Sequence, residues 1–214
     1  MRIAIIGASG WVGGAIAAEA ILRGHEATAI SRDPSPLTDL QGLTVATADL
    51  RQAASIKRAI AGHDAVVAAV VDRAAGNTAV IPQAARTLLR VLPKAHVKRL
   101  IFAGGGGSLE VAPGKRFVDA PEFPAQYRSE ALAQAEALQA LRSSSSEVDW
   151  TYVSPPPVDF LPGEKTGSYR VQGGDSVLND ENGQSKVSVA DFASAIIDEL
   201  ESPRFIGQRF TVAY

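Results

Sequence analysis

The chain of 214 residues contains no cysteine, one methionine and only three histidines. Without cysteine, disulfides, a thiolate nucleophile and cysteine-ligated metals are excluded. The histidines His25, His63 and His96 stand too far apart in sequence to form a metal-binding pair on one helix. We therefore expect them at the surface and expect no metal site.

Long hydrophobic runs and an excess of one charge are also missing. No run of about 18 apolar residues is present, so no transmembrane helix is predicted. The formal net charge of −2 gives no reason to expect a nucleic acid or an anionic membrane as partner. The N-terminus passes directly into an apolar segment, without the charged region and cleavage site of a signal peptide, which predicts a cytoplasmic location.

What is present is an alternation of strand and helix patterns over one predicted domain, residues 1–214. This alternation predicts an α/β fold, a parallel sheet with helices on both faces, and a ligand beyond the carboxyl ends of the strands. Ser188-Val189-Ala190-Asp191 resembles a capping box at the start of the last helix. The predicted strands are residues 2–6, 26–31, 43–46, 65–71, 99–102, 150–153 and 209–214; the helices before the last are 11–23, 52–61, 75–92 and 127–142.

The most informative segment is Gly7-Ala8-Ser9-Gly10-Trp11-Val12-Gly13, between an apolar strand and a helix-compatible run. In a dinucleotide site of this order, Gly7 makes the tight turn and Gly10 lets the backbone approach a pyrophosphate. Gly13 lets the helix pack close to the strand. The helix N-terminus then offers free N–H groups and a partial positive charge to the phosphates. The segment predicts a nucleotide site; the alternative is a turn kept only for packing.

The end of the second strand bears on which nucleotide binds. It finishes at Ser31 and is followed by Arg32 and Asp33. A guanidinium suits a 2′-phosphate or an adenine ring, whereas an acidic residue would serve the ribose hydroxyls of NAD. We favour NADP(H) bound through Arg32, with Ser31 as a phosphate ligand and Asp33 as the rival.

Two further strand ends are expected to touch the nucleotide. Asp49, after the third strand, either contacts the adenine amino group with Leu50 against the ring, or caps the following helix. Ala69 and Val70 close the fourth strand, where the backbone should pass the ribose on the nicotinamide side.

Two long segments rich in glycine and proline, residues 104–125 and 154–182, follow the fifth and sixth strands. Loops of this length in a compact domain are usually functional or disordered. Both begin at strand carboxyl ends, so we expect them on the substrate side of the site. The glycine run that starts at Gly104 would let an acceptor approach the nicotinamide. Four aromatic residues are candidate stacking walls, or else loop core: Phe117, Phe123, Tyr127 and Phe160.

Several of these features resemble the atypical short-chain dehydrogenases/reductases. The likeness is to the NAD(P)H-binding group of proposed NADH-flavin reductases, which is similar to biliverdin reductase B and NmrA-like proteins. It implies a Rossmann-type, doubly wound domain with a small C-terminal lobe built from the two long loops. The matching stretches cover essentially the whole chain: residues 7–13, Ser31-Arg32, Asp49-Leu50, 105–109, 149–155, 162–167 and 187–193.

The resemblance also implies site residues. It assigns Ser9, Trp11 and Val12, with the glycines, to the phosphate loop. It assigns Arg32 to the 2′-phosphate and Asp49-Leu50 to the adenine. The stretch that lies along the nicotinamide is matched by Ser154, Pro155 and Pro156.

The chain departs from the ordinary short-chain dehydrogenases at their Tyr-x-x-x-Lys pair. Tyr127 opens the fourth helix region, but residue 131 is alanine. A cation one helical turn away is what stabilises a phenolate, so Tyr127 is a weakened acid, a pocket wall or a helix-start packing residue. Ser108 is the second catalytic candidate, as a match to the family's serine after the fifth strand, or else a polar loop residue.

A nicotinamide site without a proton-transfer pair suits an acceptor that takes hydride directly and its proton from solvent. We therefore predict an NADPH-dependent reductase of a flavin or other planar, quinone-like acceptor. The alternative is a non-catalytic NAD(P)H-binding sensor of the NmrA-like type; a nucleotide-sugar epimerase or dehydratase fits less well. The expected partner is a small-molecule acceptor, and the chain is predicted to be a monomer or a homodimer.

Overall fold

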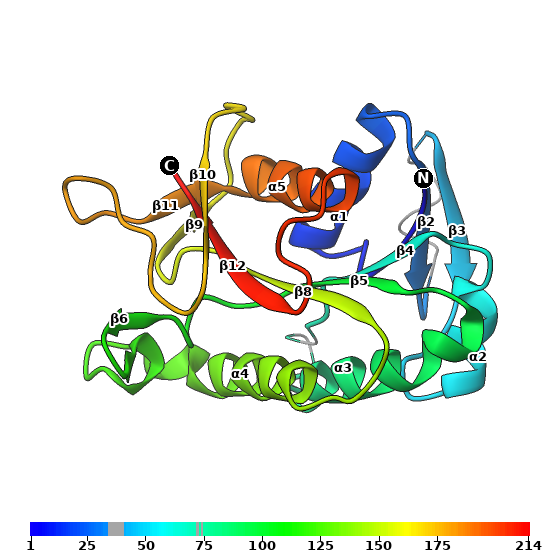
Figure 1. Cartoon of the computed structure of the whole chain (residues 1–214), viewed down its shortest axis with the longest axis horizontal. Helices are drawn as coiled ribbons and strands as arrows, with labels where there is room; N and C mark the ends of the chain where they lie inside the picture. Colours follow the sequence, from blue (N-terminus) through cyan, green and yellow to red (C-terminus); the bar gives the residue numbers. More distant parts are fainter. Residues whose placement is uncertain (34–40, 72, 74) are drawn as a thin grey trace.

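The fold is organised around one eight-stranded sheet (Figure 1). A computed structural model describes residues 1–33, 41–71, 73 and 75–214. The strand order is β10-β12-β8-β5-β4-β1-β2-β3, and all neighbours are parallel except β10 with β12. The strands are β1 (Arg2–Ile6), β2 (Glu26–Ser31), β3 (Leu43–Thr47), β4 (Ala65–Ala68), β5 (Arg99–Ala103), β8 (Asp149–Ser154), β10 (Arg170–Gly173) and β12 (Gln208–Ala213).

This order is that of a Rossmann-type doubly wound sheet, with its switch point between β1 and β4. It confirms the predicted fold class. In the register, Ile6 of β1 lies beside Ile30 of β2 and Ala68 of β4. The carboxyl ends of these three strands are therefore level, at the edge where the glycine segment leaves β1.

Helices cover both faces of the sheet (Figure 1). On one face lie α1 (Trp11–Leu22) and α5 (Val189–Glu201); on the other lie α2 (Ala53–Ile60), α3 (Val80–Val91) and α4 (Arg128–Arg142). Successive side chains of a strand point to opposite faces. In β1, Ile3 and Ile5 accordingly join the core under α1 and α5, whereas Ala4 and Ile6 join the core under the other three helices.

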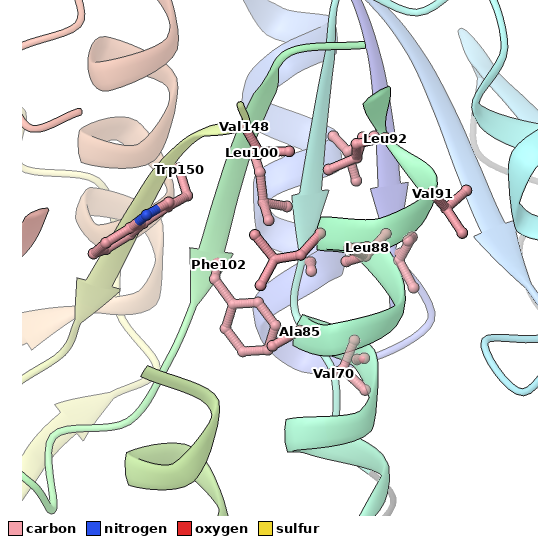
Figure 2. Packing of buried hydrophobic residues seen from close by; sticks show 14 of the residues in the cluster. Val70, Ala85, Leu88, Val91, Leu92, Leu100, Phe102, Val148 and Trp150 are labelled. Carbon is pink, nitrogen blue, oxygen red and sulfur yellow. The ribbon is translucent and has the colours of Figure 1, made fainter. Parts of the chain in front are cut away.

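The second of these cores fixes α3 against the middle of the sheet. Figure 2 shows Leu88 of α3 and Leu92, the C-cap of α3, packed over Leu100 and Phe102 of β5, with Trp150 of β8 beside them. These side chains are all buried. The strands that carry the site are thus held on both faces by apolar packing, which is the main stabilising term in folding.

The structure differs from the sequence prediction by more than one residue at two element ends. β4 ends at Ala68, not at residue 71, because its neighbour β1 ends at Ile6 and the chain turns away at Gly7. α3 begins at Val80, not at residue 75. A proline inside a helix removes an i→i−4 hydrogen bond, but in the first turn there is none to lose. Starting at Val80 places Pro82 in that first turn.

The two long segments lie at the β8–β12 side of the sheet, where most of their residues form the predicted small lobe and β10 of the second segment adds the edge strand. The first contains the hairpin β6 (Glu110–Ala112) and β7 (Lys115–Arg116); the second contains β9 (Asp159–Leu161), which pairs in parallel with β11 (Lys186–Ser188). The segments are joined where the Glu110 N–H donates to the Asp175 carbonyl and the Val177 N–H to the Glu110 carbonyl, at 2.7 and 3.0 Å. Within the described residues, no helix is long and apolar enough to span a membrane.

Candidate functional site: the phosphate loop and its surroundings

Two glycines of the first loop are required by packing inside the chain. Gly7 has φ +89°, and a Cβ there would lie 2.2 Å from the Ala69 carbonyl oxygen. A Cβ on Gly13 would lie 2.2 Å from the Gly7 carbonyl oxygen. Only glycine permits both approaches, so Gly7 brings the turn against the end of β4 and Gly13 brings α1 against the turn, as the motif predicts.

Gly10 is different, because the chain itself does not fill the space beside it. A Cβ there would meet only the Gly7 carbonyl oxygen, at 3.3 Å. Gly10 is also the N-cap of α1, with no side-chain cap and no acidic residue in the first turn. Gly14 N–H donates to the Gly10 carbonyl at 2.8 Å. Within the described chain, no hydrogen bond is recorded from the N–H groups of Trp11, Val12 and Gly13.

These open donors make the end of α1 suitable for an anion. Unpaired N–H groups and the helix dipole favour negative charge, and the exposed Ser9 precedes them on the loop. We call the space beside Gly10, together with the N–H groups of Trp11, Val12 and Gly13, the phosphate cradle. It fits a pyrophosphate, which is the group that a dinucleotide brings to this position of the fold.

The end of β2 carries the predicted nucleotide-selecting residues. Arg32 is exposed, and the Ser31 hydroxyl donates to the Asp33 carbonyl at 2.8 Å. Residues 34–40, which follow, lie outside the described residues. A cation thus stands beyond the carboxyl end of β2, on the adenine half of the sheet edge.

Asp49 is held by Arg51 and does not cap a helix. Its carboxylate accepts from the Arg51 backbone N–H at 2.9 Å and from the Arg51 guanidinium at 2.6 to 3.0 Å. These bonds to Arg51 hold the pKa of the Asp49 carboxyl below its usual range. α2 begins at Ala53 with Gln52 as N-cap, so the alternative that Asp49 caps it is wrong. Leu50 is half-buried against the core below.

At the end of β4, Ala69 and Val70 are packed against the chain itself. The Ala69 N–H donates to the Ile6 carbonyl at 2.9 Å, and the Ala69 carbonyl touches Gly7. The Val70 side chain is buried in the core beneath α3, as Figure 2 shows. The predicted contact of Ala69 and Val70 with a ribose stays a prediction.

The glycine run after β5 is explained by packing of the chain on itself. A Cβ on Gly104 would lie 1.9 Å from Cζ of Tyr152, and one on Gly106 would lie 2.5 Å from the Pro155 carbonyl oxygen. The Tyr152 hydroxyl accepts from Gly105 N–H at 3.1 Å and donates to the Gln134 carbonyl. Burial raises the pKa of Tyr152 to about 12. These contacts explain Gly104 and Gly106 without an acceptor; a cofactor contact at Gly104 stays a prediction.

Ser154 and the two prolines after it are buried at the end of β8. The Ser154 hydroxyl donates to the Gly105 carbonyl at 3.1 Å, and its own carbonyl accepts from the Thr211 hydroxyl. The Ser154-Pro155-Pro156 stretch is therefore fixed against the glycine run. Its predicted contact with nicotinamide stays a prediction.

The two catalytic candidates lie in different environments. Ser108 is buried, and its hydroxyl accepts from the guanidinium of Arg209 at 2.8 Å, which places it among interior polar groups. Tyr127 is 53% exposed at the N-cap of α4. Of the two, only Tyr127 presents its side chain to solvent, and Ser108 anchors its loop to β12.

The predicted aromatic walls separate into two groups. Phe117 and Phe123 are buried edge-to-face, with ring centroids 5.1 Å apart, so both form loop core. Phe160 lies between the rings of Trp11 and Phe192, at 4.9 and 5.0 Å. The sequence analysis assigned Trp11 only to the phosphate loop and missed this contact, because β9 and the start of α1 are about 150 residues apart.

Comparison with known proteins identifies the family of this chain. The chain matches a family model described as NAD(P)H-binding over residues 7–203. It is 40% identical to the uncharacterized protein YwnB of Bacillus subtilis over 214 residues, 99% of this chain and 98% of that protein. Among solved structures, it resembles a proposed epimerase from Bacteroides thetaiotaomicron, with 37% identity, a TM-score of 0.88, and 100% and 96% of the two chains covered.

A second solved structure is a proposed NADH-flavin reductase from Streptococcus pneumoniae, with 34% identity, a TM-score of 0.88, and 100% and 99% of the chains covered. The shared fold, the phosphate cradle and these similarities all indicate an NAD(P)H-binding protein. The chain belongs to the NAD(P)H-binding family, with an oxidoreductase-like function.

Proposed function

We propose that the protein is an NADPH-dependent reductase of a flavin or another planar conjugated acceptor. When bound, NADPH supplies a hydride, and the acceptor takes one further proton from solvent. The balance is NADPH, oxidised acceptor and one proton giving NADP⁺ and the two-electron-reduced acceptor. The chain binds and orients both molecules through the edge of the sheet at β1 and β4.

The observation that carries the proposal is the surroundings of Tyr127. Residue 131, one turn along α4, is an alanine buried against Phe123. The guanidinium of Arg128 donates to the Val118 carbonyl at 2.6 Å and lies over the Phe123 ring. At the position where a lysine would lower the pKa of a tyrosine acid, this chain has Ala131, which packs in the hydrophobic core of the loop. This arrangement supports an acceptor that needs no acid from the protein, as flavins and quinones do.

A further arginine that interacts with Tyr127 is also paired with a carboxylate. Arg73, from the segment after β4, makes two hydrogen bonds to the Glu130 carboxylate, at 2.7 and 2.8 Å. These bonds, more than the opposing effect of burial, raise the pKa of Arg73. The guanidinium is neutralised by a carboxylate of the same turn of α4 that follows Tyr127. Arg73 is close enough to Tyr127 for an electrostatic interaction, but its side-chain hydrogen bonds are made to Glu130 and not to the Tyr127 hydroxyl.

The preference for NADPH is proposed from the end of β2. No acidic residue closes that strand, and exposed Arg32 follows Ser31 directly. A guanidinium forms two parallel hydrogen bonds to a phosphate and none of equal strength to a ribose hydroxyl. Arg32 is assigned to the 2′-phosphate on this basis.

The test is NADPH oxidation by the purified protein, followed by nicotinamide absorbance, with FMN, riboflavin and a quinone offered in turn. Saturable turnover with one of them, and slower turnover with NADH, is the expected result. Tight NADPH binding without oxidation by any acceptor would contradict the reductase and favour the non-catalytic sensor. A matched control is Gly10→Ala, which fills the cradle at the end of α1.

A further inference from the structure

Trp11 is an exposed tryptophan at the edge of the site. Its side chain is 45% exposed, whereas the only other tryptophan, Trp150, is 8% exposed and lies in the core shown in Figure 2. Large aromatic side chains dominate binding surfaces when they are left open to solvent. Trp11 is also the first residue of α1, directly after Gly10, so its indole stands next to the phosphate cradle.

The indole is braced and not loosely held. The Phe160 ring lies 4.9 Å from it with an interplanar angle of 44°, and Phe160 in turn packs edge-to-face on Phe192 of α5. Phe192 is 1% exposed. One side of the indole is thus supported by a stack of rings that reaches the core, while nearly half of its surface stays open. A rigid, half-open ring is suited to stacking because little conformational entropy is lost on binding.

The segment that carries Phe160 is itself fastened to the helices beneath. Lys165 pairs with Glu19 of α1 at 2.6 Å, and the N–H groups of Thr166 and Gly167 donate to the buried Asp191 carboxylate of α5 at 2.8 to 3.1 Å. These bonds hold the strand β9 against α1 and α5. The position of the Trp11–Phe160 pair relative to α1 and α5 is therefore fixed.

The pair lies on the nicotinamide half of the sheet edge. Phe160 follows β8, and β8 neighbours β5 on the side of the switch point opposite to β2 and β3. In this fold the adenine half spreads over β2 and β3, and the reactive half over β4 and β5. An open indole between the phosphate cradle and the segment after β8 is placed where an acceptor would meet the nicotinamide.

We infer that Trp11, positioned by Phe160, is the stacking surface for the acceptor and selects planar fused-ring acceptors. This inference rests on the proposed function and deepens it by naming the residue that sets acceptor specificity. Trp11 thereby has two separable parts: its backbone N–H faces the phosphates, and its indole faces the acceptor.

The first test is binding without turnover. FMN is titrated into the protein saturated with NADP⁺, and tryptophan fluorescence is recorded with correction for FMN absorbance. Saturable quenching is expected in the wild type. In Trp11→Phe only buried Trp150 remains to report, so the saturable quenching is expected to fall to the part that energy transfer from Trp150 gives. Equal saturable quenching in both proteins would overturn the inference.

The second test separates the acceptor from the cofactor. Trp11→Leu is expected to raise the KM for FMN roughly tenfold, the size of an aromatic stacking contribution, with the KM for NADPH within about twofold of wild type. Trp11→Phe is expected to recover most of the FMN affinity, and Phe160→Leu to give an intermediate loss. A small single-ring quinone should respond less than FMN, because it offers less surface to the indole.

The outcomes distinguish this inference from the proposed function. If the wild type turns over FMN and Trp11→Leu does so with unchanged KM, the stacking role is wrong and the reductase stands. If Trp11→Leu raises the KM for NADPH instead, the indole belongs to the cofactor and the inference is overturned. If no acceptor oxidises NADPH but FMN still quenches Trp11 saturably, the stacking site stands and the reductase fails.

Discussion

The glycines of the first loop are needed for different reasons, and single substitutions should separate them. Gly13→Ala places a Cβ 2.2 Å from the Gly7 carbonyl oxygen, so backbone must shift; we expect a loss of about 1–3 kcal/mol in the free energy of unfolding, as for other overpacked sites. Gly10→Ala meets only one atom, at 3.3 Å, and should cost about 1 kcal/mol or less. It should nevertheless weaken NADPH binding at least tenfold, because the methyl group occupies the phosphate cradle.

Chemical denaturation and NADPH titration of both variants check this. Comparable NADPH affinity in Gly10→Ala and in the wild type would show that the dinucleotide does not approach the N-terminus of α1. A Gly13→Ala variant as stable as the wild type would show that α1 can move away from the turn without cost.

Arg32 carries the prediction for cofactor choice. Loss of one charge-assisted contact costs about 1.5–3 kcal/mol, so Arg32→Ala should weaken NADPH binding roughly 10- to 150-fold and leave NADH within about twofold. Arg58→Ala is the matched control, because Arg58 is an exposed arginine in the last turn of α2. Isothermal titration with both cofactors gives the comparison, and equal weakening of NADPH and NADH would remove Arg32 from the 2′-phosphate.

At the scale of elements, the buried Asp191 carboxylate joins the second long segment to α5. It accepts hydrogen bonds from Thr166, Gly167 and the Tyr214 hydroxyl, the last at 2.7 Å. Burial alone would raise the pKa of the Asp191 carboxyl, but these bonds outweigh it and hold the pKa below the ordinary 3.8. Because the folded pKa is lowered, the stabilisation is complete above about pH 5 and is lost as the pH falls through the folded pKa.

Asp191→Asn should therefore lower the free energy of unfolding by about 2–4 kcal/mol near neutral pH. The difference from the wild type should shrink below about pH 4, where the wild-type carboxyl takes up a proton. Denaturation at a series of pH values measures this, with Asp159→Asn as a control at an exposed carboxylate of β9. A difference that stays constant down to the acid limit would mean that shape and not charge holds the segment.

The same site shows what a local pattern can and cannot predict. Ser188 is the N-cap of α5 as the capping-box pattern indicates, with its hydroxyl accepting from the Asp191 N–H at 3.1 Å. The second half of that pattern is absent, because the Ser188 N–H donates to the Tyr214 hydroxyl. The Asp191 carboxylate is turned to a segment about 25 residues earlier, and nothing in a four-residue motif encodes such a partner.

The bounds of a strand and the roles of two glycines could be predicted, because each depends on residues close together in the sequence. β1 has the predicted bounds because a strand buried on both faces is a continuous apolar run. Gly7 and Gly13 follow from the backbone geometry that their spacing demands. The glycine run after β5 could not be interpreted from the sequence, since a missing side chain leaves room equally for an acceptor or for Tyr152, and only the packed structure shows Tyr152 against Gly104.

At the scale of the whole molecule, Arg209 of β12 connects the sheet to both long segments. Its buried guanidinium donates to the Ser108 hydroxyl at 2.8 Å and the Ser108 carbonyl at 3.3 Å on the first segment. It also donates to the Asp175 carbonyl on the second and forms an ion pair with the Asp175 carboxylate at 2.7 Å. Ser108 and Arg209 are 101 residues apart, so no sequence pattern marks their contact.

Arg209→Met should release both segments from β12. Removing one partner of a buried ion pair usually costs about 3–5 kcal/mol because a charge is stranded. Here Asp175 keeps a second arginine, Arg142, at 2.6 Å, so a smaller loss of about 1–3 kcal/mol is expected. Hydrogen exchange should rise in residues 104–125 and 154–182 together, because one side chain holds both.

Arg142→Met is the matched control, since it removes the other, half-exposed arginine of the same carboxylate. Exposed pairs contribute about 0–1 kcal/mol, so this variant should stay close to the wild type in stability and in exchange. If the two variants behave alike, the buried guanidinium is not what fastens the segments. If exchange rises in only one segment, the two are held independently, and the acceptor side of the site is not a single unit fixed by β12.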